Sequence, residues 1–278
     1  MALTVNTNLS ALQAYNNLSR TSANMASSMA KLSSGLRINT AADDAAGLTI
    51  SEGLKAQVNG YGIAARNAQD GINLVQTADG ALGEVHTILQ RMRDLAVQGA
   101  NDTNNVDSRK AIKAEADELG KELDRITNGT NFNGIDLLKG GTSNFQVGAG
   151  GTTNDTIAVT LADVATSVGT LSGAAGATGF DVTANGAAQT TITTIDTALT
   201  KISTDRAGLG AAQNRLNHAM NIANVSAQNL AASQSHITDT DMAQEMVSYT
   251  KSNILSQAGT AMLAQANQSG QGILKLLG

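Results

Sequence analysis

The chain contains no proline at any of its 278 positions. Because proline is the residue that most strongly kinks or ends a helix, no such break is imposed anywhere along this chain. Aromatic residues make up only 2% of the sequence, so a core must be built mainly from Ala, Leu, Ile, Val and Met. These two features favour long, uninterrupted helices that pack closely together.

Composition also excludes several classes of function. Cysteine is absent, which excludes disulfides, thiolate metal sites and cysteine nucleophiles. Charged residues are 15% of the chain and the net charge is −5, which argues against nucleic acid as the main partner. Asn and Gln interrupt the uncharged stretches 1–19 and 252–274, so we expect neither a signal peptide nor a membrane-spanning helix.

Apolar residues recur at alternating spacings of four and three residues, which places them along one face of a helix. The pattern occupies residues 11–36, 74–95, 112–126 and 195–237, and continues with weaker phase over 242–262. The third segment begins after the turn-like stretch 101–105 and stops at Asn128 and Gly129. The sequence therefore predicts a mainly α fold, a coiled-coil-like helical hairpin or bundle formed by the N- and C-terminal segments.

A middle segment, residues 140–194, differs in composition. It is rich in Gly and Thr and has no Lys or Arg. Ile157, Val159 and Leu161 alternate with smaller or polar residues, which is typical of a strand with one buried face. We expect a small β-rich insert of short strands or hairpins here, rather than helix.

Both ends of the chain are poor in charge. Residues 1–42 contain no acid, and after Glu245 the only charges are Lys251 and Lys275. Such amphipathic ends either remain loosely ordered or bury against copies of themselves. Spacing alone does not distinguish an assembly interface from an ordinary intramolecular bundle; the charge-poor ends favour self-assembly. The candidate assembly seam comprises Ala11, Tyr15, Leu18, Met25, Met29, Leu32, Leu36, Met242, Met246, Ile254, Ala258 and Met262.

No constellation of residues indicates catalysis, a cofactor or a metal ion. The histidines at 86, 218 and 236 lack ligand spacing, and the glycines at 148, 150 and 151 are not followed by Gly-Lys-Ser or Gly-Lys-Thr. Asp43 and Asp44 precede a helical pattern, where carboxylates cap a helix and complement its dipole. We therefore expect a protein that is not an enzyme and has no cofactor.

Several long motifs lie on both sides of the middle segment. They include the stretches 31–39 (KLSSGLRIN), 42–48 (ADDAAGL), 89–98 (LQRMRDLAVQ), 239–243 (DTDMA) and 261–268 (AMLAQANQ). These motifs resemble the bacterial flagellin family. The resemblance covers about four fifths of the chain and spares the Thr- and Gly-rich middle.

This resemblance implies a structural subunit of the extracellular flagellar filament used for motility. Residues 1–42 and 242–278 would line the filament channel as a helical layer that is disordered in the free subunit. Residues 43–139 and 195–241 would form a rod-like core, and 140–194 would face outward.

The implied partners are other copies of the chain, an export chaperone at the C-terminal segment, and hook-associated and cap proteins. Export would proceed unfolded through the flagellar secretion apparatus. The alternatives are a hook-filament junction protein of the same superfamily and, remotely, a filament-borne enzyme, for which no His-Glu-x-x-His motif is present.

The resemblance also implies two sites for host innate immune receptors. Arg91, Leu95 and Glu115 occupy positions read by the animal Toll-like receptor for flagellin. Residues 30–51 match the peptide sensed by the plant receptor, with Leu32, Gly35, Arg37, Asn39, Asp43, Asp44 and Gly47 as the implied contacts. Arg91 and Glu115 could equally form an ion pair within or between subunits, and Leu95 already lies on a helical seam.

Overall fold

The computed structural model describes residues 8–171 and 179–277, and most of them are helical. This confirms the predicted mainly α fold with a small strand-containing middle region. The chain divides into two compact units, residues 1–56 with 229–278, and residues 57–228. We call these the terminal unit and the rod unit and describe each by itself.

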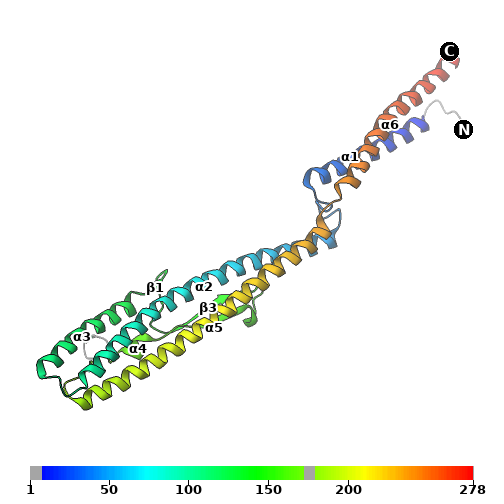
Figure 1. The fold of residues 1–278 in the computed structure, drawn as a ribbon. Coiled ribbons are helices and arrows are strands. Elements are labelled where there is room, and N and C mark those ends of the chain that lie inside the picture. Colours follow the sequence, from blue (N-terminus) through cyan, green and yellow to red (C-terminus); the bar gives the residue numbers. More distant parts are fainter. Residues whose placement is uncertain (1–7, 172–178, 278) are drawn as a thin grey trace. The chain divides into compact units, whose positions relative to one another are not determined.

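The terminal unit is built on two antiparallel helices, α1 (Leu9–Ser34) and α6 (Met242–Leu277), which lie side by side (Figure 1). The Asn8 side chain caps α1 by accepting the Ala11 N–H, and Asp241 caps α6 by accepting the N–H groups of Ala243 and Gln244. Gly35 ends α1 in the left-handed conformation, with φ of 73°.

The rod unit is organised by three helices, α2 (Ala45–Gly99), α3 (Val106–Gly129) and α5 (Asn185–Thr238). α2 and α5 are continuous helices that begin or end in the terminal unit. The rod core is drawn from all three helices, and its largest fully buried side chains include Leu82, Leu89, Met92, Leu123, Ile195, Ile202, Leu209 and Leu216.

Two ion pairs fix the antiparallel register of α2 against α5 in the rod unit. Arg93 Nε lies 2.6 Å from Asp196 Oδ1, and Arg206 Nε lies 2.8 Å from Asp79 Oδ1. These side chains are half-exposed, so they contribute more to register than to the free energy of unfolding.

Two hairpins follow α3. The short strands β1 (Asn131–Phe132) and β2 (Ile135–Asp136) are joined by Asn133 and Gly134, whose φ values of 50° and 80° suit a tight two-residue turn. The strands β3 (Thr142–Gln146) and β4 (Thr156–Thr160) pair antiparallel. A short 3₁₀ helix, η1 (Thr153–Asp155), precedes β4.

The β3–β4 hairpin packs against α2. Ile157 and Val159 are buried while Thr156, Ala158 and Thr160 are exposed, which confirms the predicted alternation. The Asn67 side chain of α2 donates to the Gln146 carbonyl at 3.0 Å. A Cβ on Gly71 would lie 3.1 Å from the Phe145 ring, so this glycine allows the strand to approach the helix closely.

The prediction of strands rather than helix throughout 140–194 is wrong in two places. Residues 164–168 form the short helix α4 (Val164–Val168), and α5 begins at Asn185, ten residues before the first predicted seam position at Ile195. The apolar seam extends backward through Ala188 and Thr191, which are buried, so tertiary packing overrides the strand preference of threonine. The threonines adapt because their hydroxyls donate to carbonyls four residues earlier, at Thr190, Thr193, Thr194 and Thr197.

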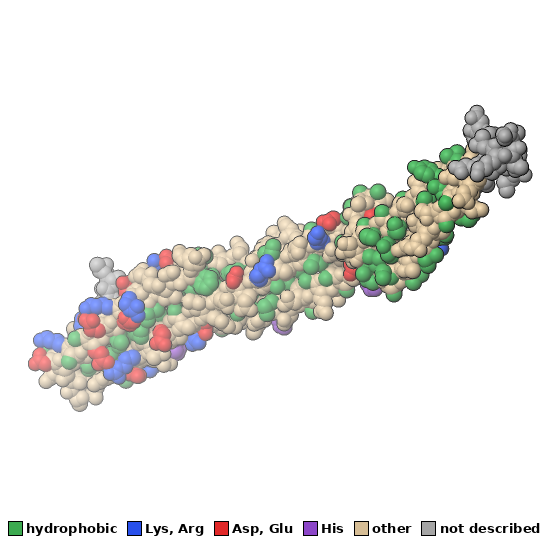
Figure 2. All heavy atoms as spheres, turned by 90° about the horizontal axis from the view of Figure 1, so that it is seen from above, with side chains coloured by type: hydrophobic (Ala, Val, Ile, Leu, Met, Phe, Trp, Pro, Cys, Tyr) green, Lys and Arg blue, Asp and Glu red, His purple; other side chains and the backbone are tan. Residues whose placement is uncertain are grey.

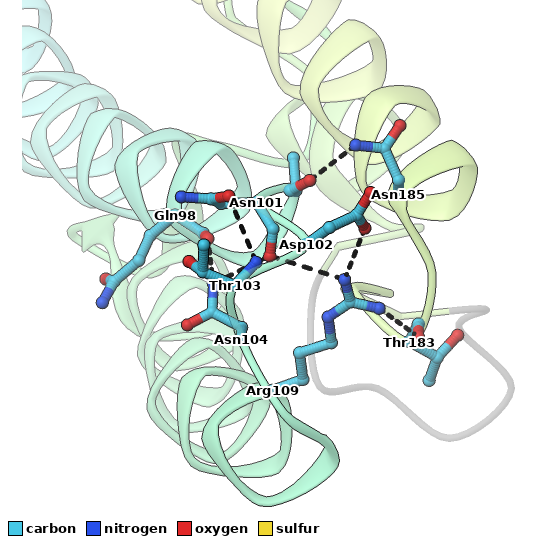
Figure 3. Close-up of polar contacts among 9 residues, drawn as sticks. Gln98, Asn101, Asp102, Thr103, Asn104, Arg109, Thr183 and Asn185 are labelled. Atoms are coloured by element: carbon cyan, nitrogen blue, oxygen red, sulfur yellow. Dashed lines mark hydrogen bonds and ion pairs between the residues drawn. The ribbon is translucent and has the colours of Figure 1, made fainter.

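A cluster of polar side chains links α2, α3 and the start of α5 through hydrogen bonds (Figure 3). Arg109 of α3 donates to the Thr183 carbonyl at 2.8 Å and lies 3.1 Å from the Asp102 carboxylate. The Asn185 side chain donates to the Ala100 carbonyl at 2.5 Å. The α2–α3 turn is thereby tied to the residues that lead into α5.

The predicted bounds of the third helix are confirmed, because α3 begins directly after the 101–105 turn and ends at Gly129. The division into 1–42 with 242–278, 43–139 with 195–241, and 140–194 differs from the two compact units, which place the middle segment with the rod helices. Parts of these ranges, residues 1–7, 172–178 and 278, lie outside the described residues.

Candidate assembly surface

The packing of α1 against α6 combines small side chains with several larger ones. The partly or fully buried positions of α1 are Ala11, Ala14, Leu18, Thr21, Met25, Ser28, Lys31 and Leu32, and those of α6 are Glu245, Tyr249, Ser252, Asn253, Ser256, Gly259, Leu263 and Ala266. A Cβ on Gly259 would lie 3.2 Å from Leu18 Cδ1, and the Asn8 side chain donates to the Ala266 carbonyl at 2.9 Å. The small residues in this set let the two backbones approach closely.

The large apolar side chains of this helix pair are left on its outside. Figure 2 shows hydrophobic side chains gathered over the part that carries α1 and α6, while charged side chains gather around the part that carries α3. The exposed large apolar residues of α1 and α6 are Leu9, Leu12, Tyr15, Met29, Met242, Met246, Val247, Ile254, Leu255 and Met262. We call these ten residues the apolar face; on α6 they extend around the sides that the contact with α1 leaves open. It remains exposed within a single copy of the chain.

The structure distributes the predicted seam over two sides of the helix pair. Ala11, Leu18, Met25 and Leu32 are partly buried. The exposed members are Tyr15, Met29, Leu36, Met242, Met246, Ile254, Ala258 and Met262. Within the subunit, the contact between α1 and α6 thus uses some of the predicted seam positions together with the small residues next to them, and the role of the seam in self-assembly stays a prediction. Sequence reasoning missed Ala14, Thr21 and Ser28, whose 3-and-4 spacing with Leu18 and Met25 was the available signal.

The apolar face includes a shallow hollow on α6. It has a volume of about 480 Å³ and is lined by Met246, Val247, Thr250, Lys251, Ile254 and Leu255. A second hollow, lined by residues of both helices, is polar and has Lys31 and Glu245 among its lining residues. The outside of α6 thus offers an apolar surface beside a polar groove.

The turn between α1 and α2 is held to the end of α5. The Arg37 backbone N–H donates to the Thr238 carbonyl and its Nη2 donates to the Ile237 carbonyl, both at 2.6 Å. Leu36 and Asp239 form an antiparallel bridge. Arg37 therefore caps the C-terminus of α5, where a cation complements the helix dipole.

The predicted capping role of the two aspartates is divided between two structures. Asp44 Oδ1 accepts the Gly47 N–H at 2.8 Å and caps α2. Asp43 Oδ2 accepts the N–H of Thr40, the Thr40 hydroxyl and the N–H of Asn39. These hydrogen bonds, from the Thr40 backbone first, lower the pKa of Asp43 below its ordinary value.

The remaining residues of the implied plant epitope are also built into this turn. The Asn39 side chain donates to the Ser34 hydroxyl at 2.8 Å. A Cβ on Gly47 would lie 2.5 Å from Asp44 Oδ2 and 2.7 Å from Ile38 Cδ1, so no larger residue fits there without movement. Leu32 is partly buried, and Gly35 supplies the left-handed turn.

The three residues implied as a Toll-like receptor contact lie close together on α2 and α3. Arg91 Nη2 lies 2.6 Å from Glu115 Oε1, and both side chains are about half-exposed. Leu95 is 2% exposed and belongs to the rod core. In the folded subunit, a partner would meet the ion pair and not the Leu95 side chain.

Within residues 8–171 and 179–277, no three His, Asp or Glu side chains are grouped so that they could hold a metal ion. In the same part of the chain, no helix is long and apolar enough to cross a membrane.

Two family models match the chain on either side of its middle segment. The bacterial flagellin N-terminal helical region matches residues 5–143, and the bacterial flagellin C-terminal helical region matches residues 192–277. The chain belongs to the bacterial flagellin family. Members of the flagellin family are structural proteins and not enzymes, and the chain is a structural subunit of the flagellar filament, a homopolymer formed by self-assembly.

Individual flagellins agree with this assignment. The flagellin of Halalkalibacterium halodurans is 46% identical, over 98% of this chain and 99% of the relative. The flagellin of Bacillus subtilis is 43% identical over the same shares. A crystal structure of Bacillus cereus flagellin, 36% identical, superposes with a TM-score of 0.50 and covers 61% of this chain and 94% of that one. Nothing among these relatives favours the hook-filament junction alternative.

Proposed function

We propose that the apolar face of α1 and α6 is the surface by which copies of this chain bury one another in the filament. One observation carries the proposal: although α1 and α6 pair with each other, ten of their large apolar side chains remain exposed in the single copy. Clustered exposure of this kind marks an interaction surface. The homopolymer supplies its occupant, a second copy of the chain.

The energetics fit reversible growth by subunit addition. Burying about 1,000 Å² of apolar surface per subunit would contribute roughly 25 kcal/mol. The ordering of the terminal segments offsets much of this gain. Contacts between different surfaces of successive copies do not close on themselves and so propagate a helical filament.

The test compares variants that carry a new carboxylate on the apolar face with control variants that carry one at an exposed polar position. Tyr15→Asp and Ile254→Asp each charge an exposed apolar position. Gln13→Asp and Asn17→Asp add the same charge at exposed polar positions of α1. We expect the first two variants to lose seeded elongation in electron micrographs while the second two elongate.

Circular dichroism and the thermal transition of each variant report whether the rod unit is still folded. Normal filaments from Tyr15→Asp and Ile254→Asp would contradict the proposed surface. Loss of elongation in all four variants would show sensitivity to charge in general rather than to the apolar face.

The proposal includes the state of the subunit before assembly. Free subunits would keep residues 1–42 and 242–278 disordered and order them on addition, as a layer lining the channel.

The proposal also extends to partners other than copies of the chain. A chaperone would cover the C-terminal segment, whose apolar face includes Met246 and Ile254, before unfolded export to the cell exterior. Hook-associated and cap proteins would bound the filament, and host receptors would read the Arg91–Glu115 pair and the 30–51 turn.

A further inference from the structure

Methionine is concentrated on the apolar face. The sequence has eight methionines, and four of them lie on the outside of α1 and α6: Met29, Met242, Met246 and Met262 are 50, 48, 53 and 65% exposed. Met92 in the rod core is 0% exposed, and Met25 and Met220 are partly buried. These four thioethers are open to solvent in the α1–α6 pair, and the proposed disorder of residues 1–42 and 242–278 would leave them open in the free subunit as well. They sit where a neighbouring copy is proposed to dock.

We propose that these four methionines are oxidation sites through which peroxide excludes a free subunit from the filament. The inference rests on the proposed function of the apolar face. It assigns to the same face a covalent modification that is made before assembly.

The reaction needs only a peroxide. A sulfur lone pair attacks one peroxide oxygen, the O–O bond breaks and an S–O bond forms. The departing hydroxide takes up the proton of the transferred oxygen and leaves as water. Sulfur is oxidised by two electrons to the sulfoxide, and the peroxide is reduced by two.

The consequence follows from the change in polarity. A thioether is apolar and flexible, whereas a sulfoxide is a strong hydrogen-bond acceptor that must lose its water when the face is covered. Met246 lines the α6 hollow with Val247, Ile254 and Leu255, which have no side-chain donor. Of the two other lining residues, Thr250 already donates its hydroxyl to the Met246 carbonyl, and Lys251 has a donor. Four sulfoxides on one face would therefore oppose docking at several points.

The same geometry makes the effect selective. A subunit already in the polymer has its apolar face covered by neighbours, so its thioethers are shielded from peroxide. Oxidation would therefore mark subunits before addition and leave completed filament unchanged. Methionine sulfoxide is reduced by methionine sulfoxide reductases, one type for each sulfoxide epimer, so the block is reversible.

The experiment treats purified full-length subunits with hydrogen peroxide, removes the oxidant and adds untreated filament seeds. Peptide mass spectrometry measures sulfoxide at each methionine, and sedimentation measures the critical concentration for elongation. We expect Met29, Met242, Met246 and Met262 to oxidise at least tenfold faster than Met92, and the critical concentration to rise at least tenfold. Reduction by the two reductase types together should restore it.

Matched variants identify the sites responsible. One variant carries Met→Leu at the four exposed positions and another carries Met92→Leu. Treated protein is compared with untreated protein of the same variant, so any effect of leucine on elongation itself cancels. The fourfold variant should lose the peroxide effect and Met92→Leu should keep it. Preassembled filaments treated identically should show at least tenfold slower oxidation at the four sites.

Three results would overturn the inference: slow oxidation of the four sites in free subunits, elongation unaffected by their oxidation, or a fourfold variant that stays as sensitive as the parent. Each is distinguishable from failure of the proposed function. If the apolar face is an assembly surface, Ile254→Asp still blocks elongation even where oxidation does not.

Discussion

A Cβ atom placed on Gly259 of α6 would lie 3.8 Å from the Cβ of Leu18 on α1. That separation is about the mean between the Cβ atoms of a disulfide. Because the sequence contains no cysteine, a pair introduced here has no competing thiol. We predict that the variant with Leu18→Cys and Gly259→Cys forms a disulfide rapidly under mild oxidation. Non-reducing electrophoresis and peptide mapping would measure it.

The matched control for this pair is Asn16→Cys with Gly259→Cys. Asn16 is exposed and lies about 200° around α1 from Leu18, so its thiol should point away from α6. Equal yields from both pairs would contradict the α1–α6 register. Comparing free subunits with filaments also measures how far the pair has formed before assembly.

Acidification should loosen the turn between α1 and α2. Hydrogen bonds from Thr40 and Asn39 stabilise the Asp43 carboxylate and lower its pKa from 3.8. A carboxyl group whose pKa is lower in the folded state stabilises that state above the unfolded pKa, and this contribution is lost as pH falls through the folded pKa. We therefore expect the Thr40 amide resonance to titrate with a midpoint below 3.8.

The variant Asp43→Asn provides the control for this titration, because it keeps the size of the side chain and removes the charge. Its Thr40 resonance should show no such transition. A midpoint at or above 3.8 in the parent protein would show that these hydrogen bonds do not hold the carboxylate in solution.

Two isoleucines on α5 differ strongly in burial. Ile202 is 0% exposed in the rod core and Ile222 is 64% exposed. Ile202→Ala should lower the free energy of unfolding by about 2–5 kcal/mol, because it removes buried methyl groups and leaves a cavity. Ile222→Ala should change it by less than about 0.5 kcal/mol. Urea unfolding of the full-length subunit measures both, and a comparable loss at the two sites would refute the assigned core face of α5.

Arg109 should control the opening of the α2–α3 turn. It donates to the Thr183 carbonyl and contacts Asp102 (Figure 3), and a hydrogen bond to a charged group contributes about 1.5–3 kcal/mol. We predict that Arg109→Met raises amide hydrogen exchange in residues 100–105 by about tenfold or more. Arg125→Met on the same helix removes only the exposed pair with Glu122 and should leave that exchange unchanged.

Helix existence was predictable wherever the 3-and-4 pattern was strong. α3 began after the 101–105 turn because Asn105 caps it, accepting the Ser108 N–H at 2.7 Å. The start of α5 was not predictable from composition, because Thr190, Thr193 and Thr194 favour strands locally. Their helical state depends on Ala188 and Thr191 being buried in the rod core.

The sequence predicts on which segments the candidate surface lies, but it does not decide which stripe of α1 meets α6. The charge-poor ends indicated that 1–42 and 242–278 would contact other copies. Which stripe of α1 meets α6 depended on how closely the two backbones approach, and that distance is set by Gly259, Ser28 and similar small residues acting together. The buried stripe of α1 includes Ser28, which is one residue before the predicted seam position Met29, and Met29 is therefore exposed.

The sequence by itself determined that this chain forms long helices, because it has no proline and its apolar residues repeat at helical spacing. It also determined the family, because the long motifs at 31–48, 89–98, 239–243 and 261–268 can be identified from the sequence alone. Only the tertiary structure decided which side of each terminal helix is covered within the subunit. Helical periodicity defines the faces of one helix, whereas the choice between two adjacent stripes depends on how the side chains of both helices fit between two backbones.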